Sequence, residues 1–120
     1  MRALIAIVVA TVALISSSCK PMPTVEDVRR LRQLQQQYGN RYRFDLAEDT
    51  YIEATNKVDA AVNKAEAIAI YKVFWFTGDT ERRDSNYVYL NLYDKEGHFQ
   101  FQIFWDRNNH RFVTSNQDHY

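Results

Sequence analysis

The sequence contains little cysteine, proline or glycine: one Cys, two Pro and three Gly among 120 residues. A single Cys excludes an intramolecular disulfide. The three Gly stand apart from one another, which excludes a glycine-rich phosphate-binding loop. Acidic and basic side chains balance at 15 each, so no charge excess points to nucleic acid as a partner. No apolar run reaches the roughly 20 residues that a membrane-spanning helix needs.

The beginning of the chain has the pattern of a secretory signal peptide. Arg2 supplies a positive charge, and the segment Ala3–Ile15 is apolar apart from one Thr. This length suits the apolar region of a signal peptide, which runs about 7–15 residues. Small residues, Ser16 and Ser18, then precede Cys19, as cleavage before Cys19 requires. We therefore expect the mature chain to begin at Cys19.

The same segment resembles the lipobox of bacterial lipoproteins, in which a small residue precedes a Cys that is acylated and becomes the first residue. Ser16 stands where that family usually has Leu, and the nearest Leu lies two residues too early. The resemblance implies that Cys19 is lipidated and anchors the chain to a membrane. Lys20, in place of Asp, implies the outer membrane, facing the periplasm, if the source is Gram-negative. Plain secretion with a free thiol and an uncleaved anchor are the alternatives.

Three segments follow from these observations. Residues 1–18 are the expected signal peptide, 19–23 a lipidated tether whose two prolines favour extended backbone, and 24–120 a single domain. Every Phe, Tyr and Trp lies at Tyr38 or beyond. Because no disulfide is available, we expect aromatic burial to stabilise this small domain.

Apolar spacing of three and four residues predicts a first helix over 25–38, with Thr24 as its N-cap and Gly39 as its end. Its expected apolar stripe consists of Val25, Val28, Leu31, Leu34 and Tyr38. Its expected solvated face consists of Arg29, Arg30, Arg32, Gln33 and 35–37.

The same spacing predicts a second helix that begins at Thr55 or Asn56 and ends before Gly78. Its expected buried face includes Val58, Ala61, Val62, Ala65, Ile68, Ala69, Val73 and Phe76. Aromatic and β-branched residues crowd the stretch 67–76, so a strand there is the alternative.

Alternating polar and apolar residues predict the strands. The pattern indicates an early hairpin over 41–45 and 50–55, and a three-stranded meander over 87–93, 99–103 and 111–114. A charged loop is expected between the second helix and the meander. The order α-β-β-α-β-β-β predicts an α+β fold, with two helices packed on one face of an antiparallel sheet.

Candidate binding residues come from the strand pattern and the charged loop. Five aromatic side chains are expected on the face opposite Val88, Leu90 and Leu92: Tyr87, Tyr89, Tyr93, Phe104 and Trp105. Such side chains offer large contact area with a polar tip. From the charged loop, Arg82 and Arg83 are further candidates for contact with a partner. The alternatives are that a helix or the tether covers this face, or that Tyr simply suits strands.

Signals for catalysis are weak. Asp94, Glu96 and His98 alternate across a turn, but their spacing is explained by turn chemistry, so no metal site is expected. We expect no catalytic residues and no cofactor, and a hydrolase that uses His110 or the Asp94 group is disfavoured. The chain is therefore interpreted as a non-catalytic envelope lipoprotein that binds a protein partner. The alternative is a binding module for glycan or a small apolar ligand.

Overall fold

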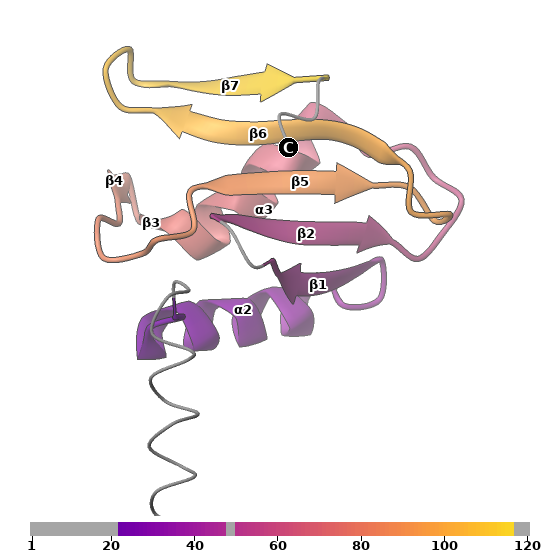
Figure 1. Cartoon of the computed structure of the whole chain (residues 1–120), viewed down its shortest axis with the longest axis horizontal. Coiled ribbons are helices and arrows are strands. Elements are labelled where there is room, and N and C mark those ends of the chain that lie inside the picture. Colours follow the sequence, from indigo (N-terminus) through magenta and orange to yellow (C-terminus); the bar gives the residue numbers. More distant parts are fainter. Residues whose placement is uncertain (1–21, 48–49, 117–120) are drawn as a thin grey trace, which may run out of the picture.

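The structure, a computed structural model, describes residues 22–47 and 50–116 (Figure 1). The predicted signal peptide and the lipidation site at Cys19 lie outside these residues. The elements are α2 (Val25–Tyr38), β1 (Tyr42–Leu46), β2 (Tyr51–Asn56), α3 (Lys64–Trp75), β3 (Phe76–Thr77), β4 (Thr80–Glu81), β5 (Tyr89–Tyr93), β6 (Phe99–Asp106) and β7 (Arg111–Ser115). The predicted α+β class is confirmed.

The main sheet has five strands in the order β1-β2-β5-β6-β7 (Figure 1). The early hairpin β1–β2 and the meander β5–β6–β7 are both present and antiparallel. β2 and β5 pair in parallel, with Ile52 beside Leu90 and Ala54 beside Leu92. The sheet is therefore mixed and not wholly antiparallel, because the chain crosses through α3 between the hairpin and the meander.

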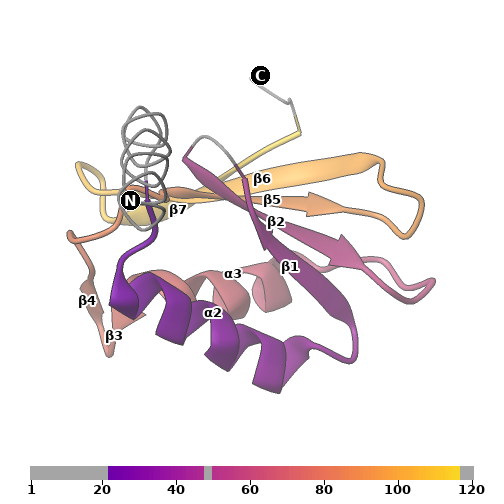
Figure 2. The same ribbon diagram turned by 60° about the horizontal axis from the view of Figure 1, so that its bottom comes forward.

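Both helices lie on the same face of the sheet (Figure 2). The core forms between them and the inward side chains of the strands, where Ile52, Leu90, Leu92 and Ile103 are buried together with Phe74 of α3. Eight of the sixteen buried apolar residues in the described part of the chain are aromatic, so aromatic side chains make up much of the core, as expected. Among the described residues, no helix has the length and apolar character needed to span a bilayer.

α2 begins where predicted because two reciprocal hydrogen bonds between Thr24 and Asp27 cap its N-terminus. The Thr24 hydroxyl accepts from the Asp27 amide at 3.0 Å, and the Asp27 carboxylate accepts from the Thr24 amide at 3.0 Å. At the other end, Gly39 has a right-handed backbone, φ −64°, which any residue can adopt. Glycine is needed there because the Gln35 carbonyl lies too close to leave room for a side chain. A Cβ at Gly39 would lie 2.2 Å from the Gln35 carbonyl oxygen.

The predicted apolar stripe of α2 is only partly buried. Leu34 is in the core, but Val25 and Val28 are exposed. The expectation that Arg30 is solvated is wrong: its guanidinium donates to the Val73 carbonyl at 3.1 Å and also to the Phe76 carbonyl. Arg30 is buried because it satisfies carbonyls where α3 ends, and that position also suits a cation in the field of the helix dipole.

α3 begins later than predicted. Asn63 caps it through a side-chain oxygen that accepts from the Glu66 amide at 2.7 Å. Asn56 instead ends β2, where its side chain accepts from the Val58 amide at 3.0 Å and donates to the Ala60 carbonyl at 2.5 Å. Residues 57–63 therefore form a connection and not the first turns of a helix. The helical interpretation of 67–76 is confirmed up to Trp75, and Phe76 begins β3.

The predicted charged loop contains a short hairpin, β3–β4, that turns at Gly78 with φ +62°. Beyond it, Arg82 is buried and not solvated. Its guanidinium donates to the Phe74 carbonyl at 2.7 Å and to the Asp27 carboxylate at 2.6 Å. These partners satisfy the buried guanidinium, and through them Arg82 joins the end of α3 to the start of α2.

Candidate functional site

The sheet has one face that neither α2 nor α3 covers, and we call it the outer face (Figures 1 and 2). In β5, Leu90 and Leu92 are buried on the helix side, so Tyr89, Asn91 and Tyr93 point to the outer face. The outer face consists of Arg43, Asp45, Tyr51, Glu53, Thr55, Tyr89, Asn91, Tyr93, Phe99, Gln102, Phe104, Val113 and Ser115.

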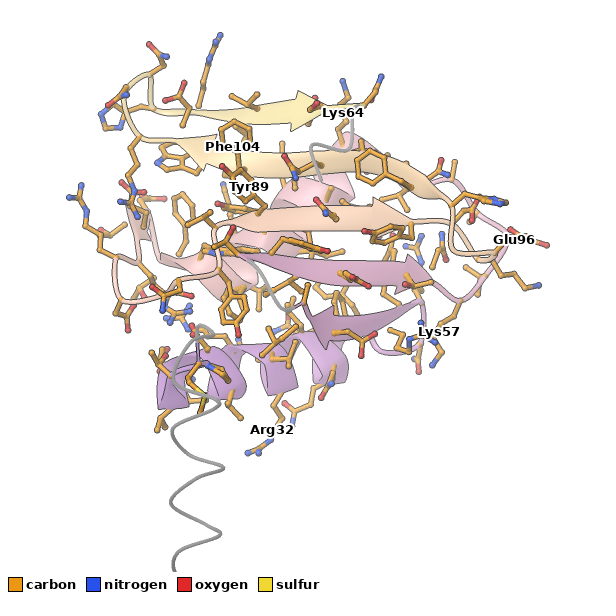
Figure 3. The ribbon with its side chains drawn as sticks, in the orientation of Figure 1. Arg32, Lys57, Lys64, Tyr89, Glu96 and Phe104 are labelled. Atoms are coloured by element: carbon orange, nitrogen blue, oxygen red, sulfur yellow. The ribbon has the colours of Figure 1, made fainter. Side chains whose placement is uncertain are left out.

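One row across the outer face is aromatic and apolar. Tyr51, Tyr89, Phe104 and Val113 are aligned by the pairing of β2, β5, β6 and β7. The rings of Tyr89 and Phe104 meet edge to face, with centroids 5.3 Å apart and planes at 72° (Figure 3). All four side chains are half-buried, so each keeps accessible surface. Part of the aromatic surface of this row therefore remains exposed to solvent in the folded domain.

The next row is polar. It runs through Glu53, Asn91, Gln102 and Ser115 by the same strand pairing. Gln102 Nε2 donates to Asn91 Oδ1 at 2.9 Å, and both side chains are buried. In the described part of the chain, Asn91 Nδ2 is the one buried side-chain nitrogen or oxygen that lacks a hydrogen-bond partner. Such an atom costs about 1–3 kcal/mol, so it marks a place where stability has been given up.

A third row combines Thr55, Tyr93 and Phe99. The rings of Tyr93 and Phe99 are 5.9 Å apart, because a β-bulge at the start of β6 makes Gln100 an extra residue. Phe99 thereby leaves the face of Phe101, where strict alternation along the predicted strand 99–103 would place it. The polar row thus lies between two aromatic pairs.

A hollow opens at one end of the outer face. It has a volume of about 330 Å³ and is lined by Arg43, Glu53, Thr55, Tyr93 and the turn 95–97. Burial raises the pKa of the Glu53 carboxyl above its ordinary value of 4.5, and the negative charge of Asp45 raises it further. A hydrogen-bonding group of a ligand can therefore meet a carboxyl, a hydroxyl and a guanidinium here.

Two of the predicted aromatic residues are not on the outer face. Tyr87 precedes β5 and is buried, and its carbonyl accepts from the indole N–H of Trp75. Trp105 points to the helix side, where its ring packs 5.3 Å from Phe76 and 4.8 Å from Phe112. The prediction that both lie on the same face as Tyr89 is therefore wrong. Trp105 is two residues from Ile103 and points to the same side of the sheet, and Tyr87 lies before the strand begins.

The two loop arginines differ. The Arg82 guanidinium is occupied by internal partners, whereas the Arg83 side chain is 74% exposed and lies 3.6 Å from Glu81. Arg83, Trp105 and His110 line a second open hollow of about 230 Å³. Arg83 therefore stays accessible for contact with a partner, on a different side of the domain from Tyr89.

Asp94, Glu96 and His98 do come together, with potential ligand atoms within 4.8 Å of one another. The Asp94 carboxylate accepts from the amides of Glu96 at 3.0 Å and His98 at 2.8 Å, and its other oxygen lies 3.2 Å from the His98 ring. The backbone N–H of His98 lowers the pKa of Asp94. These contacts close the β5–β6 turn, and a cation would have to compete with them.

Sequence reasoning identified Tyr89 and Tyr93 but missed Glu53, Asn91 and Tyr51. The period-two alternation of residues 50–55, extended across the sheet, is the signal that points to Glu53 and Tyr51. No family model matches the chain, and comparison with curated proteins and with solved structures finds no match.

Proposed function

We propose that this chain is a non-catalytic, membrane-anchored lipoprotein of the bacterial envelope that binds a protein partner through the outer face. The observation that carries the proposal is the pair of aromatic clusters, Tyr89 with Phe104 and Tyr93 with Phe99, on the face opposite both helices. Half-buried aromatic side chains are held rigidly and still expose area, so they lose little entropy on binding.

The polar row between the clusters supports specificity. Asn91 and Gln102 place buried amide groups beneath the centre of the face, and Glu53 lies beside Asn91 in the neighbouring strand. A partner that brings an acceptor close to Asn91 Nδ2, after a small movement of its neighbours, would satisfy the unpaired donor. Protein interfaces typically combine aromatic anchors with a few placed hydrogen bonds in this way.

Anchoring rests on the sequence of the first twenty residues. Cys19 is the only Cys, it follows two small residues at the required spacing, and acylation removes a free thiol from an oxidising compartment. Metabolic labelling with a fatty-acid probe tests this step. The chain is expected to take up the label and the Cys19→Ala variant to lose it, whereas an unlabelled wild-type chain contradicts the anchor.

Partner binding is tested by co-purification from detergent-solubilised envelope. The wild-type chain is expected to retain one stoichiometric partner, and the Tyr89→Ala, Phe104→Ala double variant to lose it. Lys72→Ala, an exposed substitution on the helix side, serves as the matched control and should retain the partner. Retention by the Tyr89, Phe104 variant would place the binding surface elsewhere.

The hollow beside Tyr93 favours a second candidate function, the binding of an envelope glycan. An aromatic ring next to a carboxyl and a guanidinium can stack on a sugar and bond its hydroxyls. The backbone amide signals of Thr55 and Gly97, which line the hollow, report this directly by NMR. If they shift with peptidoglycan fragments, the glycan function gains support, and unchanged signals across a panel of fragments contradict it.

A further inference from the structure

Apolar side chains are exposed at the beginning of α2. Met22 is 62% exposed, Val25 88% and Val28 41%. α2 buries Asp27, Arg30 and Leu34 on its core side, so Val25 and Val28 lie on the face of the helix that is turned to solvent. Elsewhere in residues 22–47 and 50–116, Val58 is the one other large apolar side chain exposed to this degree, at 40%. The first turn of α2 therefore exposes two valines where the domain offers them nothing to pack against.

These side chains lie very close in sequence to the proposed anchor. Met22 is the third residue after Cys19, and an extended chain spans at most about 3.6 Å per residue, so Met22 lies within about 11 Å of Cys19. An acylated Cys19 sits at the level of the lipid headgroups. The tether is therefore too short to hold the start of α2 away from the membrane surface.

We call Met22, Val25 and Val28 the apolar patch. The charged side chains beside this patch are already paired with opposite charges within the domain. Glu26 lies 2.5 Å from both Arg29 and Arg30, and these guanidiniums lower the pKa of Glu26 to about 2. Asp27 is buried against Arg82. The two carboxylates of the first turn thus carry partner cations, which lowers the cost of bringing this end of the domain to lipid.

We propose that Met22, Val25 and Val28 insert into the headgroup region of the membrane and fix the orientation of the domain. The proposal rests on the anchor at Cys19. Arg32 lies on the same exposed face of α2 as Val25 and Val28, about 10 Å beyond Val25 along the helix at about 1.5 Å per residue. Its exposed guanidinium would then lie level with lipid phosphates, while the apolar end sits deeper.

The test uses the processed chain, residues 19–120, coupled through its single thiol to a maleimide lipid in phosphatidylcholine vesicles. Two variants each add one Trp at an exposed Val: Val25→Trp in the patch and Val58→Trp as the matched control. Lipids with brominated acyl chains quench Trp that enters the bilayer boundary. The native Trp75 and Trp105 contribute equally to both variants.

We expect brominated lipid to remove about half or more of the added emission in Val25→Trp, because a side chain inserted about 5–10 Å lies within reach of the bromines. Val58→Trp should lose none. Equal quenching of the two variants, or none at Val25→Trp, overturns the proposal. A change in the emission of Val25→Trp that follows protein concentration and not lipid also overturns it, because it would indicate that a second copy of the chain covers this side chain.

Chemical coupling separates this proposal from the anchor itself. If the fatty-acid probe fails to label the native chain, the lipoprotein assignment fails whatever the vesicles show. If the probe labels Cys19 and brominated lipid spares Val25→Trp, the anchor stands and the inserted patch is wrong.

Discussion

The carboxylate of Asp27 and the guanidinium of Arg82 meet at 2.6 Å although 55 positions separate them in the chain. Both side chains are buried. Asp27 also caps α2 through Thr24, and Arg82 also binds the Phe74 carbonyl at the end of α3. The pair therefore joins the start of one helix to the end of the other and holds the first turn of α2 in place.

Removing one member of this pair should be strongly destabilising. In Arg82→Met, the Asp27 carboxylate stays buried without its cation, and the Phe74 carbonyl loses a donor. We expect the free energy of unfolding to fall by about 3–5 kcal/mol, the usual loss for a broken buried ion pair. Urea denaturation followed by circular dichroism measures it.

The neighbouring Arg83 supplies the control. Its side chain is exposed and lies 3.6 Å from Glu81, so Arg83→Met should change the free energy of unfolding by less than about 0.5 kcal/mol. Similar losses in the two variants would show that Arg82 contributes only as a surface charge.

Buried arginines show where sequence reasoning stops. Capping and apolar spacing predict the bounds of α2 correctly, since these are local signals carried by Thr24, Asp27 and Gly39. The fate of Arg30 and Arg82 depends on carbonyls and a carboxylate 8 to 55 positions away. A charged side chain is solvated by default, so only the tertiary structure reveals that these two are internal.

The amide pair on the outer face should couple energetically. Asn91→Leu alone leaves the Gln102 amide buried without a partner and is expected to cost about 1–3 kcal/mol of unfolding free energy. Replacing both Asn91 and Gln102 with Leu removes the unpaired Nδ2 as well, and stability should return to the wild-type value or exceed it.

A double-mutant cycle in urea measures this coupling. Additive losses from the two single substitutions would contradict a direct bond between the amides. The double variant should also fail to bind the partner, because stability gained by removing polar groups from a binding surface comes with lost function.

Glu53 should make stability depend on pH. Its pKa is raised in the folded state, so the folded chain binds a proton more readily than the unfolded chain. Between the ordinary value of 4.5 and the raised pKa, stability therefore falls as pH rises. Glu53→Gln should be more stable than wild type at neutral pH, with the difference fading as the pH falls through this window towards 4.5.

Asp45→Asn provides the matched comparison, since Asp45 is the negative charge that further raises the pKa of Glu53. This variant should show a weaker dependence of unfolding free energy on pH across the same window. A Glu53→Gln variant whose stability follows the wild type at every pH would show that the Glu53 carboxyl is freely solvated.

The outer face was only partly predictable. Alternation places Tyr89 and Tyr93 correctly because it depends on the two-residue period of a strand. The bulge that brings Phe99 to Tyr93 changes that period at one position, and nothing in the local pattern marks it. The parallel pairing of β2 with β5, which sets Glu53 beside Asn91, joins segments separated by α3 and has no local signal either.

Site-specific photo-crosslinking in intact cells tests the central claim, that the outer face binds a protein partner. A benzophenone amino acid replaces Tyr89 or Phe104 on this face, or Gln36 on the exposed side of α2. We expect one adduct of the same mass from Tyr89 and Phe104 and none of that mass from Gln36. Absence of an adduct at Tyr89 and Phe104, or the same adducts from all three positions, would contradict it.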